Sequence, residues 1–326
     1  MKGMFRAAAS VALASMLIAS SAFAQATAWP RQSVKVLVPY AAGGLPDTVA
    51  RVVGQRLSDK WGQPVIIENK PGGNGVISAQ ALMSSPPDGY TLMITDMSMF
   101  VINPFIYSKL PYDPQKDFTN ISLIARAPLF LAVHPSMPVR NFEDFVALAR
   151  KEPGTLSYGS SGVGSIHHLT FEAIKAALGI DVLHVPFKGT GQSVPAVVSN
   201  QVSAVFSAYP SLGGFVKENK LKLIAVNSKE RSSLAPDVAT IAETSIPGFD
   251  FAPSIGVWGP AGLPAGVPEK IAGDIADLLK DVSMKDRLRG LGIDPVGLGP
   301  QAFTQQLAAD RVRYKQAVEI AGAKAD

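Results

Sequence analysis

The chain has 326 residues, of which 47% are hydrophobic, and its formal net charge is +4. It contains no cysteine, which excludes disulfides and thiol chemistry. Its Lys and Arg residues form no basic run, which argues against a nucleic-acid partner. Its four histidines have no metal-ligand spacing, so we expect no metal site, and nothing in the chain calls for an organic cofactor.

The N-terminal segment has the pattern of a secretory signal peptide. Lys2 and Arg6 precede a short apolar run, which ends in the small-residue sequence AFA. The run is shorter than the roughly 20 residues that span a bilayer, so an uncleaved anchor is disfavoured. We predict a signal peptide over residues 1–24, with cleavage before Gln25 and export of the remaining chain.

Strand-like and helix-like patterns then alternate. Short β-branched runs predict strands at 34–39, 65–68 and 90–95, with helices starting at Pro46 and at 76–84. The rhythm restarts near residue 126 and continues to about residue 228. The predicted strands there are 129–133, 156–159, 182–186, 204–207 and 223–226, and the helices are 142–151, 165–178 and 194–199. The tail adds a strand at 255–259 and helices at 269–279 and 300–321. Such alternation predicts parallel sheets with right-handed crossovers.

Two stretches share one plan, in which a strand leads through a small-residue loop into a helix. They are VLVPYAAGGLPDTVARVVGQRL in the first block and LSYGSSGVGSIHHLTFEAIKAAL in the second. Ligands of open α/β sheets bind beyond the carboxyl ends of the strands, where both loops fall. We therefore expect the two units to face each other across a cleft and to direct helix N-terminal N–H groups at one ligand.

The second loop does not match a nucleotide-binding pattern or a nucleophile elbow. Ser165 stands where a phosphate loop needs Lys, and His167 stands where a dinucleotide fingerprint needs its third Gly. The G-x-S-x-G pattern is absent. Ser165 and His168 are three residues apart, but a triad also needs an orienting acid and an oxyanion hole, so we predict Ser165 to be a helix N-cap.

The composition of the loops favours an anion cradle made of neutral donors. No Lys or Arg occurs within 158–166 or 40–48, while serine hydroxyls and free backbone N–H groups are plentiful. Asp47 is the only acid in either loop, so paired-carboxylate hydrolysis has no second group. We expect Asp47 to complement the helix dipole and to pair with Arg51. These features fit the reversible capture of a carboxylate, and we predict no catalytic residue.

Six short motifs follow one another along the chain: VPYAAGGLPDTVAR (38–51), ENKPGG (68–73), PDGYTL (87–92), LPYDPQKDF (110–118), YGSSGVGS (158–165) and HVPFKG (184–189). Together they resemble the motifs of the Bug (TctC-type) extracytoplasmic solute receptors, which serve tripartite tricarboxylate transporters. The likeness runs in order through essentially the whole chain after the signal segment.

The resemblance implies an α/β, two-lobed, type II periplasmic-binding-protein fold with a ligand cleft between the lobes. Lobe 1 is expected to comprise 25–125 plus about 256–326, and lobe 2 about 126–255. The chain crossings are expected near 125–129 and between about 226 and 259. A periplasmic monomer would capture a small carboxylate, namely a di- or tricarboxylate, an amino acid or an aromatic acid. Its partners would be the membrane permease subunits of the transporter or, alternatively, the periplasmic domain of a sensor protein.

The same resemblance, with the neighbouring strand ends, marks a set of ligand-binding residues. They are Tyr40, Ala41, Ala42, Gly43, Leu45, Asp47, Met97 and Ser98 in lobe 1, and Ser160, Ser161, Gly164, Ser165, Ile166, Lys188, Gly189, Thr190 and Tyr209 in lobe 2.

The chain departs from the family pattern at two places. Thr190-Gly191-Gln192-Ser193 stands where Pro-Ala is common, and Ser207-Ala208-Tyr209 stands where a polar pair is common. Apolar side chains near the cleft then suggest an apolar wall and a weak preference for an aromatic or apolar-bodied carboxylate: Met97, Met99, Phe100, Phe187 and Tyr209. The enzyme alternative is a secreted esterase that uses Ser165 and His168.

Overall fold

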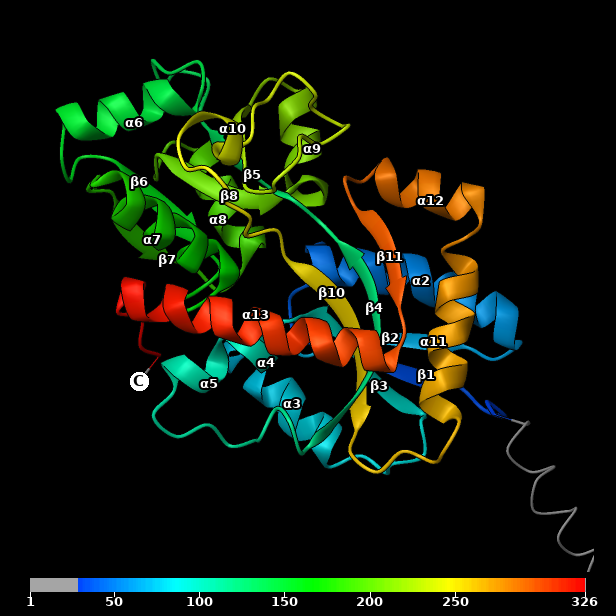
Figure 1. Cartoon of the computed structure of the whole chain (residues 1–326). Helices are drawn as coiled ribbons and strands as arrows, with labels where there is room; N and C mark the ends of the chain where they lie inside the picture. Colours follow the sequence, from blue (N-terminus) through cyan, green and yellow to red (C-terminus); the bar gives the residue numbers. More distant parts are fainter. Residues whose placement is uncertain (1–28, 326) are drawn as a thin grey trace, which may run out of the picture.

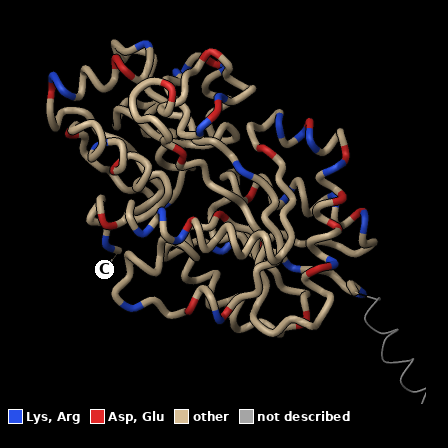
Figure 2. The backbone as a smooth tube through the Cα atoms, viewed as in Figure 1, with Lys and Arg blue, Asp and Glu red and all other residues tan. Residues whose placement is uncertain are grey.

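The computed structural model describes residues 29–325, which form two β-sheets covered by helices (Figure 1). The predicted signal peptide lies outside the described residues. Among the described helices, none is long and apolar enough to cross a membrane. Charged residues of both signs are interspersed along the chain (Figure 2).

The first sheet has six strands, and its helices come from both ends of the chain. Its strands in spatial order are β11 (Asp294–Leu298), β4 (Phe118–Arg126), β10 (Ser254–Pro260), β3 (Thr91–Asp96), β1 (Val34–Val38) and β2 (Val65–Asn69). The accompanying helices are α2 (Leu45–Trp61), the 3-10 turn η2 (Gly73–Gly75), α3 (Val76–Met83), α4 (Ser98–Val101), α5 (Asn103–Ile106), α11 (Val267–Leu278), α12 (Val282–Arg289) and α13 (Pro300–Ala321).

The second sheet has five strands from the middle of the chain. In spatial order they are β7 (Leu183–Pro186), β6 (Ser157–Ser160), β8 (Ala204–Ala208), β5 (Leu129–Val133) and β9 (Lys222–Val226). The accompanying helices are α6 (Phe142–Lys151), α7 (Ile166–Leu178), α8 (Thr190–Val198), α9 (Tyr209–Lys217) and α10 (Ile241–Thr244).

Both sheets are mixed, which corrects the prediction of parallel sheets. Strands β1, β2 and β3 are parallel, as are β6, β7 and β8. The strand that follows each parallel trio in spatial order, β10 or β5, runs antiparallel to it. It does so because each comes from a segment that crosses between the sheets. The two-lobed α/β fold itself is confirmed. The shared plan of the two strand–loop–helix stretches is also seen in the topology, because β1 and β6 hold equivalent positions in their sheets.

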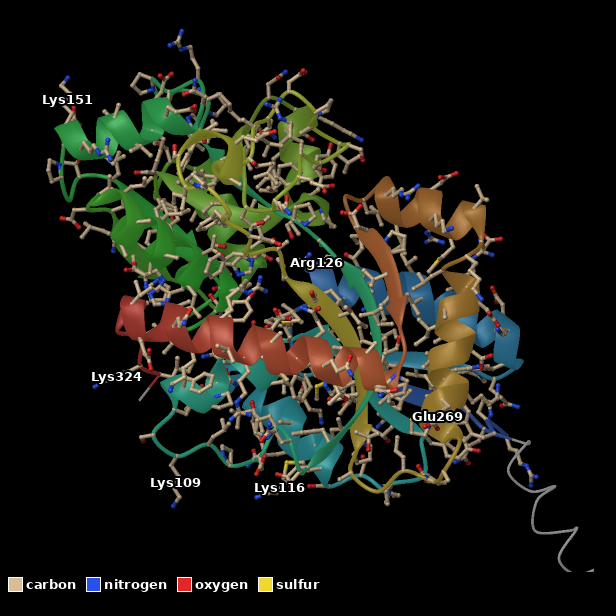
Figure 3. The ribbon with its side chains drawn as sticks, viewed as in Figure 1. Lys109, Lys116, Arg126, Lys151, Glu269 and Lys324 are labelled. Atoms are coloured by element: carbon tan, nitrogen blue, oxygen red, sulfur yellow. The ribbon has the colours of Figure 1, made fainter. Side chains whose placement is uncertain are left out.

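Two chain segments connect the sheets, and a buried asparagine joins them. The first passes from β4 to β5 through Ala127, whose backbone N–H bonds to Pro253 O of the returning segment at 3.0 Å. Asn227, which is fully buried, accepts a bond from Leu129 N (2.7 Å) and donates one to Phe251 O (2.9 Å). The ion pair between Arg126 and Asp250 (3.1 Å) adds a second link beside them; Arg126 is labelled in Figure 3. The crossing region is therefore a bonded unit.

Apolar packing anchors the strand ends that carry the loops. Four of the five residues of β1 are buried, and Pro46 in the first turn of α2 suits the start of that helix. In the first lobe Phe100 stacks on the buried Trp258 with ring centroids 4.1 Å apart. Helix α13 lies along the first lobe and also contacts α7 of the second (Figure 1).

Candidate functional site

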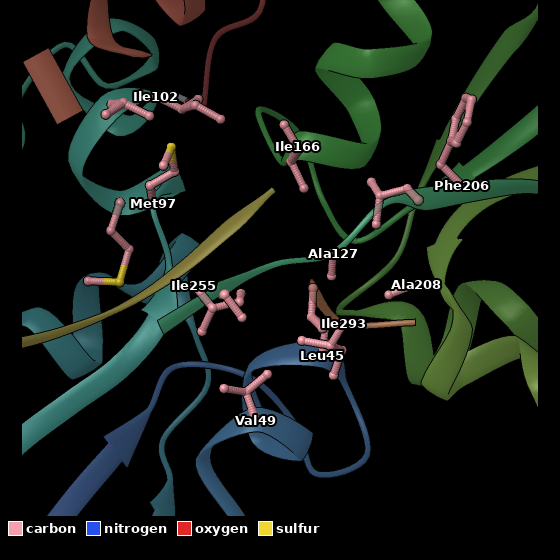
Figure 4. Close-up of a cluster of buried hydrophobic side chains, with 14 of the residues drawn as sticks. Leu45, Val49, Met97, Ile102, Ala127, Ile166, Phe206, Ala208, Ile255 and Ile293 are labelled. Carbon is pink, nitrogen blue, oxygen red and sulfur yellow. The ribbon is translucent and has the colours of Figure 1, made fainter. Parts of the chain in front are cut away.

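The junctions between strands and helices in both lobes converge on one cavity. The loop from β1 to α2 supplies one wall, and the loops β6–α7, β7–α8 and β8–α9 supply the other. Figure 4 shows Leu45, Ile166 and Ala208 from three of these junctions gathered near Ala127 of the crossing segment. The lining residues are Tyr40, Ala41, Ala42, Gly44, Leu45, Pro46, Asp96, Leu129, Ser161, Ile166, His167, Gly189, Thr190, Gly191, Ser207, Ala208, Ser211 and Pro253.

Four helices begin at this cavity, and three of them have no side-chain cap. Helices α2, α8 and α9 start after Gly44, Gly189 and Ala208, none of which caps the first turn with a side chain. Only α7 is capped, by Ser165, whose hydroxyl accepts a bond from His168 N. The first-turn N–H groups of a helix have no intrahelical partner and carry partial positive charge. The cavity therefore offers positive potential with no Lys or Arg among its described lining residues.

The cavity has a small inner part and a wide mouth. The inner volume is about 40 Å³, room for on the order of three waters. A hollow of about 710 Å³ lies beside it and shares Tyr40, Ala41, Ser161, Gly189 and Gly191 with it. The mouth also carries Lys188 and Phe187. A compact ligand would reach the helix ends by way of this hollow.

The first loop is held in shape by Asp47. Its carboxylate accepts bonds from Gly43 N (2.9 Å), Asn69 Nδ2 (2.9 Å) and Arg51 Nε (3.0 Å). Asn69 Nδ2 also donates to Tyr40 O at 3.0 Å. Burial alone would raise the pKa of Asp47, but these donors outweigh it and hold the pKa below its usual value. The predicted pair with Arg51 is confirmed, and it turns Asp47 away from a ligand and into the loop.

The serines of the second loop also bond to groups of their own lobe. Ser160 Oγ lies 2.6 Å from His184 Nε2, and Ser165 Oγ donates to Gly162 O at 2.7 Å. His168 Nδ1 accepts a bond from Gly164 N at 3.1 Å. The hydroxyl of Ser165 and the ring of His168 therefore do not face each other as a nucleophile and its base. The geometry counts against the esterase alternative.

The histidine pair is divided between the cavity and the core. His167 lines the cavity and its Nδ1 lies 2.7 Å from Ser161 Oγ, whereas the ring of His168 stacks on His184 at 4.1 Å. Loss of hydration lowers the pKa of His167 to about 4, so its ring is neutral near pH 7. A neutral imidazole adds one more uncharged donor or acceptor to the wall.

Eight predicted binding residues line the inner cavity, and the rest lie elsewhere. The eight are Tyr40, Ala41, Ala42, Leu45, Ser161, Ile166, Gly189 and Thr190. Lys188 lines only the mouth. The residues that line neither part are Gly43, Asp47, Met97, Ser98, Ser160, Gly164, Ser165 and Tyr209.

The residues expected to form an apolar wall do not line the inner cavity, although other apolar side chains do, among them Leu45, Leu129 and Ile166. Met97, Met99 and Phe100 are at least 97% buried in the first lobe's core; Figure 4 shows Met97 near Ile102. Phe187 reaches only the mouth, and Tyr209 packs edge-on against Phe130 at 5.9 Å. The preference for an aromatic or apolar-bodied carboxylate therefore loses these five side chains as its support and stays a prediction.

Four polar residues line the cavity although the sequence does not predict them to bind ligand: Asp96, His167, Ser207 and Ser211. Asp96 directly precedes the predicted binding residues Met97 and Ser98, and Ser207 is expected only as a departure from a family pattern. The sequence predicts no role for His167 beyond the first turn of a helix. The available signal was their position: Asp96 and Ser207 lie at the ends of strands that lead into the cavity, and His167 and Ser211 lie in the first turns of helices α7 and α9. No group of His, Cys, Asp and Glu that could hold a metal ion occurs among residues 29–325.

Comparison with known proteins agrees with the two-lobed fold. The family model described as the tripartite tricarboxylate transporter family receptor matches residues 49–322. The structure of Rpa4515 from R. palustris with adipate is 31% identical, with a TM-score of 0.88 over 91% of this chain and 99% of that one.

Two further structures are similar over most of their length. MatC from Rhodopseudomonas palustris with bound malate is 28% identical, with a TM-score of 0.82 over 89% of this chain and 100% of that one. The periplasmic binding protein BugD is 26% identical, with a TM-score of 0.84 over 91% and 99%. The chain therefore belongs to the tripartite tricarboxylate transporter family receptors, the Bug (TctC-type) solute receptors that its motifs resemble.

Proposed function

We propose that this chain is a periplasmic receptor that captures one small carboxylate between its lobes and delivers it to the permease of a tripartite tricarboxylate transporter. The observation that carries the proposal is the convergence of four helix N-termini, from both lobes, on one cavity that no Lys or Arg of residues 29–325 lines. Each helix end contributes roughly 0.3–2 kcal/mol to an anion held in its first turn. Binding would thus be firm but reversible.

The ligands of similar proteins support a carboxylate. One similar structure holds adipate and another holds malate, both of which are small carboxylates. Neutral N–H and hydroxyl donors recognise a carboxylate by geometry, so they can release it without breaking a strong ion pair. Ser161 Oγ and His167 Nδ1 lie 2.7 Å apart in the cavity wall, but among the described residues no acid is hydrogen-bonded to the His167 ring to complete a triad, which fits a receptor better than a hydrolase.

Lobe closure would bury the ligand. We propose the lobes as 25–125 plus about 256–326 and as about 126–255, moving about the two crossing segments as a monomer. Asn74 Nδ2 of the first lobe donates to Val163 O of the second at 2.9 Å across the mouth. Such a bond forms only when the lobes are together, so it would favour the closed form that a permease recognises.

A thermal-shift screen against small carboxylates, with sugars and amines as comparison sets, tests the proposal. A ligand at 100 times its dissociation constant should add about 2.7 kcal/mol to the free energy of unfolding. Stabilisation by carboxylates alone is the expected result. Stabilisation by sugars or simple amines and by no carboxylate would refute the carboxylate site. Capture of the permease or of a sensor's periplasmic domain by the liganded protein would then separate transport from sensing.

The predicted export has its own test. Mass spectrometry of the protein recovered from the periplasmic fraction should give an N-terminus at Gln25. Recovery of the intact N-terminus from the cytoplasm would contradict the predicted signal peptide.

A further inference from the structure

An acidic side chain lies in the wall of a cavity whose other features suit an anion. Asp96 ends β3 and lines the inner cavity, and only 6% of the residue is exposed. No Lys or Arg lines this cavity among the described residues. Asp96 is therefore largely withdrawn from bulk solvent, and no cationic side chain among the described lining residues balances its charge.

Asp47 is a buried carboxylate that supports the fold, and it has a charged partner. Asp47 is 2% exposed, and Arg51 pairs with it at 2.9 Å. Asp96 accepts a bond from Ser98 N at 2.8 Å, and the hydroxyls of Ser98 and Tyr40 are its other neighbours that favour the ionised carboxylate; all three groups are neutral. A carboxylate has about four acceptor positions, so these neutral groups leave at least one open. A buried charge without a charged partner is costly unless a ligand provides one.

A second polar group in the same wall also awaits a partner. Ser207 is fully buried and lines the cavity, and its hydroxyl has no hydrogen-bond partner among the described residues. Buried polar groups are almost always bonded, so an orphan in a cavity wall points to a ligand atom. This observation is independent of Asp96, because Ser207 belongs to β8 of the other lobe.

The two kinds of charge in the cavity suit a zwitterion. The helix ends of both lobes attract a carboxylate. A second carboxylate at Asp96 would meet a like charge, whereas an ammonium group there would form a charge-assisted bond and relieve the unpaired burial.

We propose that Asp96 receives a protonated amino group, so that the ligands of this receptor are amino-carboxylates. The inference rests on the proposed function and names the ligand class of that site. It replaces the expectation of an apolar-bodied acid, whose supporting side chains lie outside the inner cavity. Burial raises the pKa of Asp96 above its usual value, and an adjacent cation would lower it again.

Matched ligand pairs test the inference by calorimetric titration. Three pairs of ligands differ by one amino group: alanine and propionate, aspartate and succinate, and phenylalanine and 3-phenylpropionate. Lactate and malate are added because they carry a hydroxyl group where alanine and aspartate carry the amino group. In at least one pair, the ligand that carries the amino group should bind at least about tenfold more tightly than the ligand that lacks it. Hydrogen bonds to charged groups contribute that much free energy. Equal or tighter binding of every deamino partner would overturn the inference while leaving the receptor proposal standing. Binding by no carboxylate of either kind would overturn both.

The variant Asp96→Asn keeps the size of the side chain and an acceptor for Tyr40 and Ser98. It should remove the preference for the amino member, and any succinate binding should stay equal or become tighter. A preference that survives the change would overturn the role of Asp96. The matched control Asp277→Asn removes an exposed carboxylate on α11 and should leave the preference unchanged. If Asp96→Asn fails to fold, the wild-type ranking of the pairs decides the matter alone.

Discussion

Replacement of Ser207 by Ala should have opposite effects on stability and on binding. The Ser207 hydroxyl is fully buried in the cavity wall and has no partner among the described residues. A buried, unsatisfied hydroxyl costs about 1–3 kcal/mol in the unliganded protein. Ser207→Ala removes that cost and loses little volume. We therefore expect the free energy of unfolding of the ligand-free protein to rise by about 1 kcal/mol, or about 2–4 °C in Tm.

Binding should weaken in the same variant because the ligand loses a hydrogen-bond partner. A neutral hydrogen bond contributes about 0.5–1.5 kcal/mol, which corresponds to about a two- to twelvefold weaker affinity. The assay combines urea unfolding of the ligand-free protein with calorimetric titration of a carboxylate identified by thermal shift. The two measurements should move in opposite directions.

Ser193 provides a matched control for this variant. Its hydroxyl is also fully buried and unpartnered among the described residues, but Ser193 lies on α8 outside the cavity lining. Ser193→Ala should raise stability in the same way without changing affinity. If Ser207→Ala lowers stability and leaves affinity unchanged, then its hydroxyl serves the fold and the reasoning fails.

Three further predictions concern the second loop, the crossing region and the histidines. Gly164→Val should weaken ligand binding by at least about tenfold, because a Cβ at φ +74 would lie 2.2 Å from Ile106 Cδ1 of the other lobe and oppose closure; titration measures it. Asn227→Ala should lower the free energy of unfolding by about 2–3 kcal/mol in urea, because it leaves buried backbone groups of both crossings unbonded. Loss of hydration lowers the pKa of His167 and of His184 to about 4, so the folded protein binds fewer protons than the unfolded chain between pH 6.5 and 4. Its free energy of unfolding should fall as the pH drops through that window, by at most about 1.4 kcal/mol per pH unit for each histidine, and by less in practice because both rings are partly exposed.

Each of these predictions has its own control. Gly179→Val places the same side chain at a similar φ of +61 with open space around it, so it should strain the backbone without affecting binding. Asn200→Ala, at an exposed turn, should cost far less stability than the change at Asn227. Replacement of His167 and His184 by Gln should reduce the pH dependence above pH 4, and burial of His168, which also lowers that ring's pKa, should account for a remainder. Wild-type stability that is constant from pH 6.5 to 4 would contradict the burial of the two rings.

Local patterns predicted the units that carry the site. The segments VKVLV and SYGS each lead into a small-residue loop and an amphipathic helix, and the periodicity of the sequence reports that directly. The starts of α2 and α7 were readable from Pro46 and from the N-cap Ser165. These signals lie within a few residues of the feature they predict.

Nonlocal pairings were not readable from the sequence. Strand β10 joins the first sheet between β3 and β4, although more than a hundred residues separate it from either, and this insertion makes the sheet mixed. The expectation of a parallel sheet failed because alternating elements do not reveal where a returning strand enters.

The same limit explains the residues that the site prediction missed. Asp96 and Ser207 end strands of different sheets, and only the closure of the lobes brings them to one cavity. Asp47 was predicted both to bind ligand and to pair with Arg51. The second role is observed, because the carboxylate also reaches back to Gly43 N and so shapes the loop.

The central claim is that one small carboxylate binds in the cavity between the lobes. Its most direct test is a calorimetric titration of the best carboxylate from the thermal-shift screen against wild type and Thr190→Trp. Thr190 lines the cavity at the start of α8 and is only partly buried, so the larger side chain should fill the site without unfolding the protein. The account predicts one bound carboxylate per chain in wild type and none in the folded Thr190→Trp variant. Undiminished binding in that variant would place the ligand elsewhere and contradict the account.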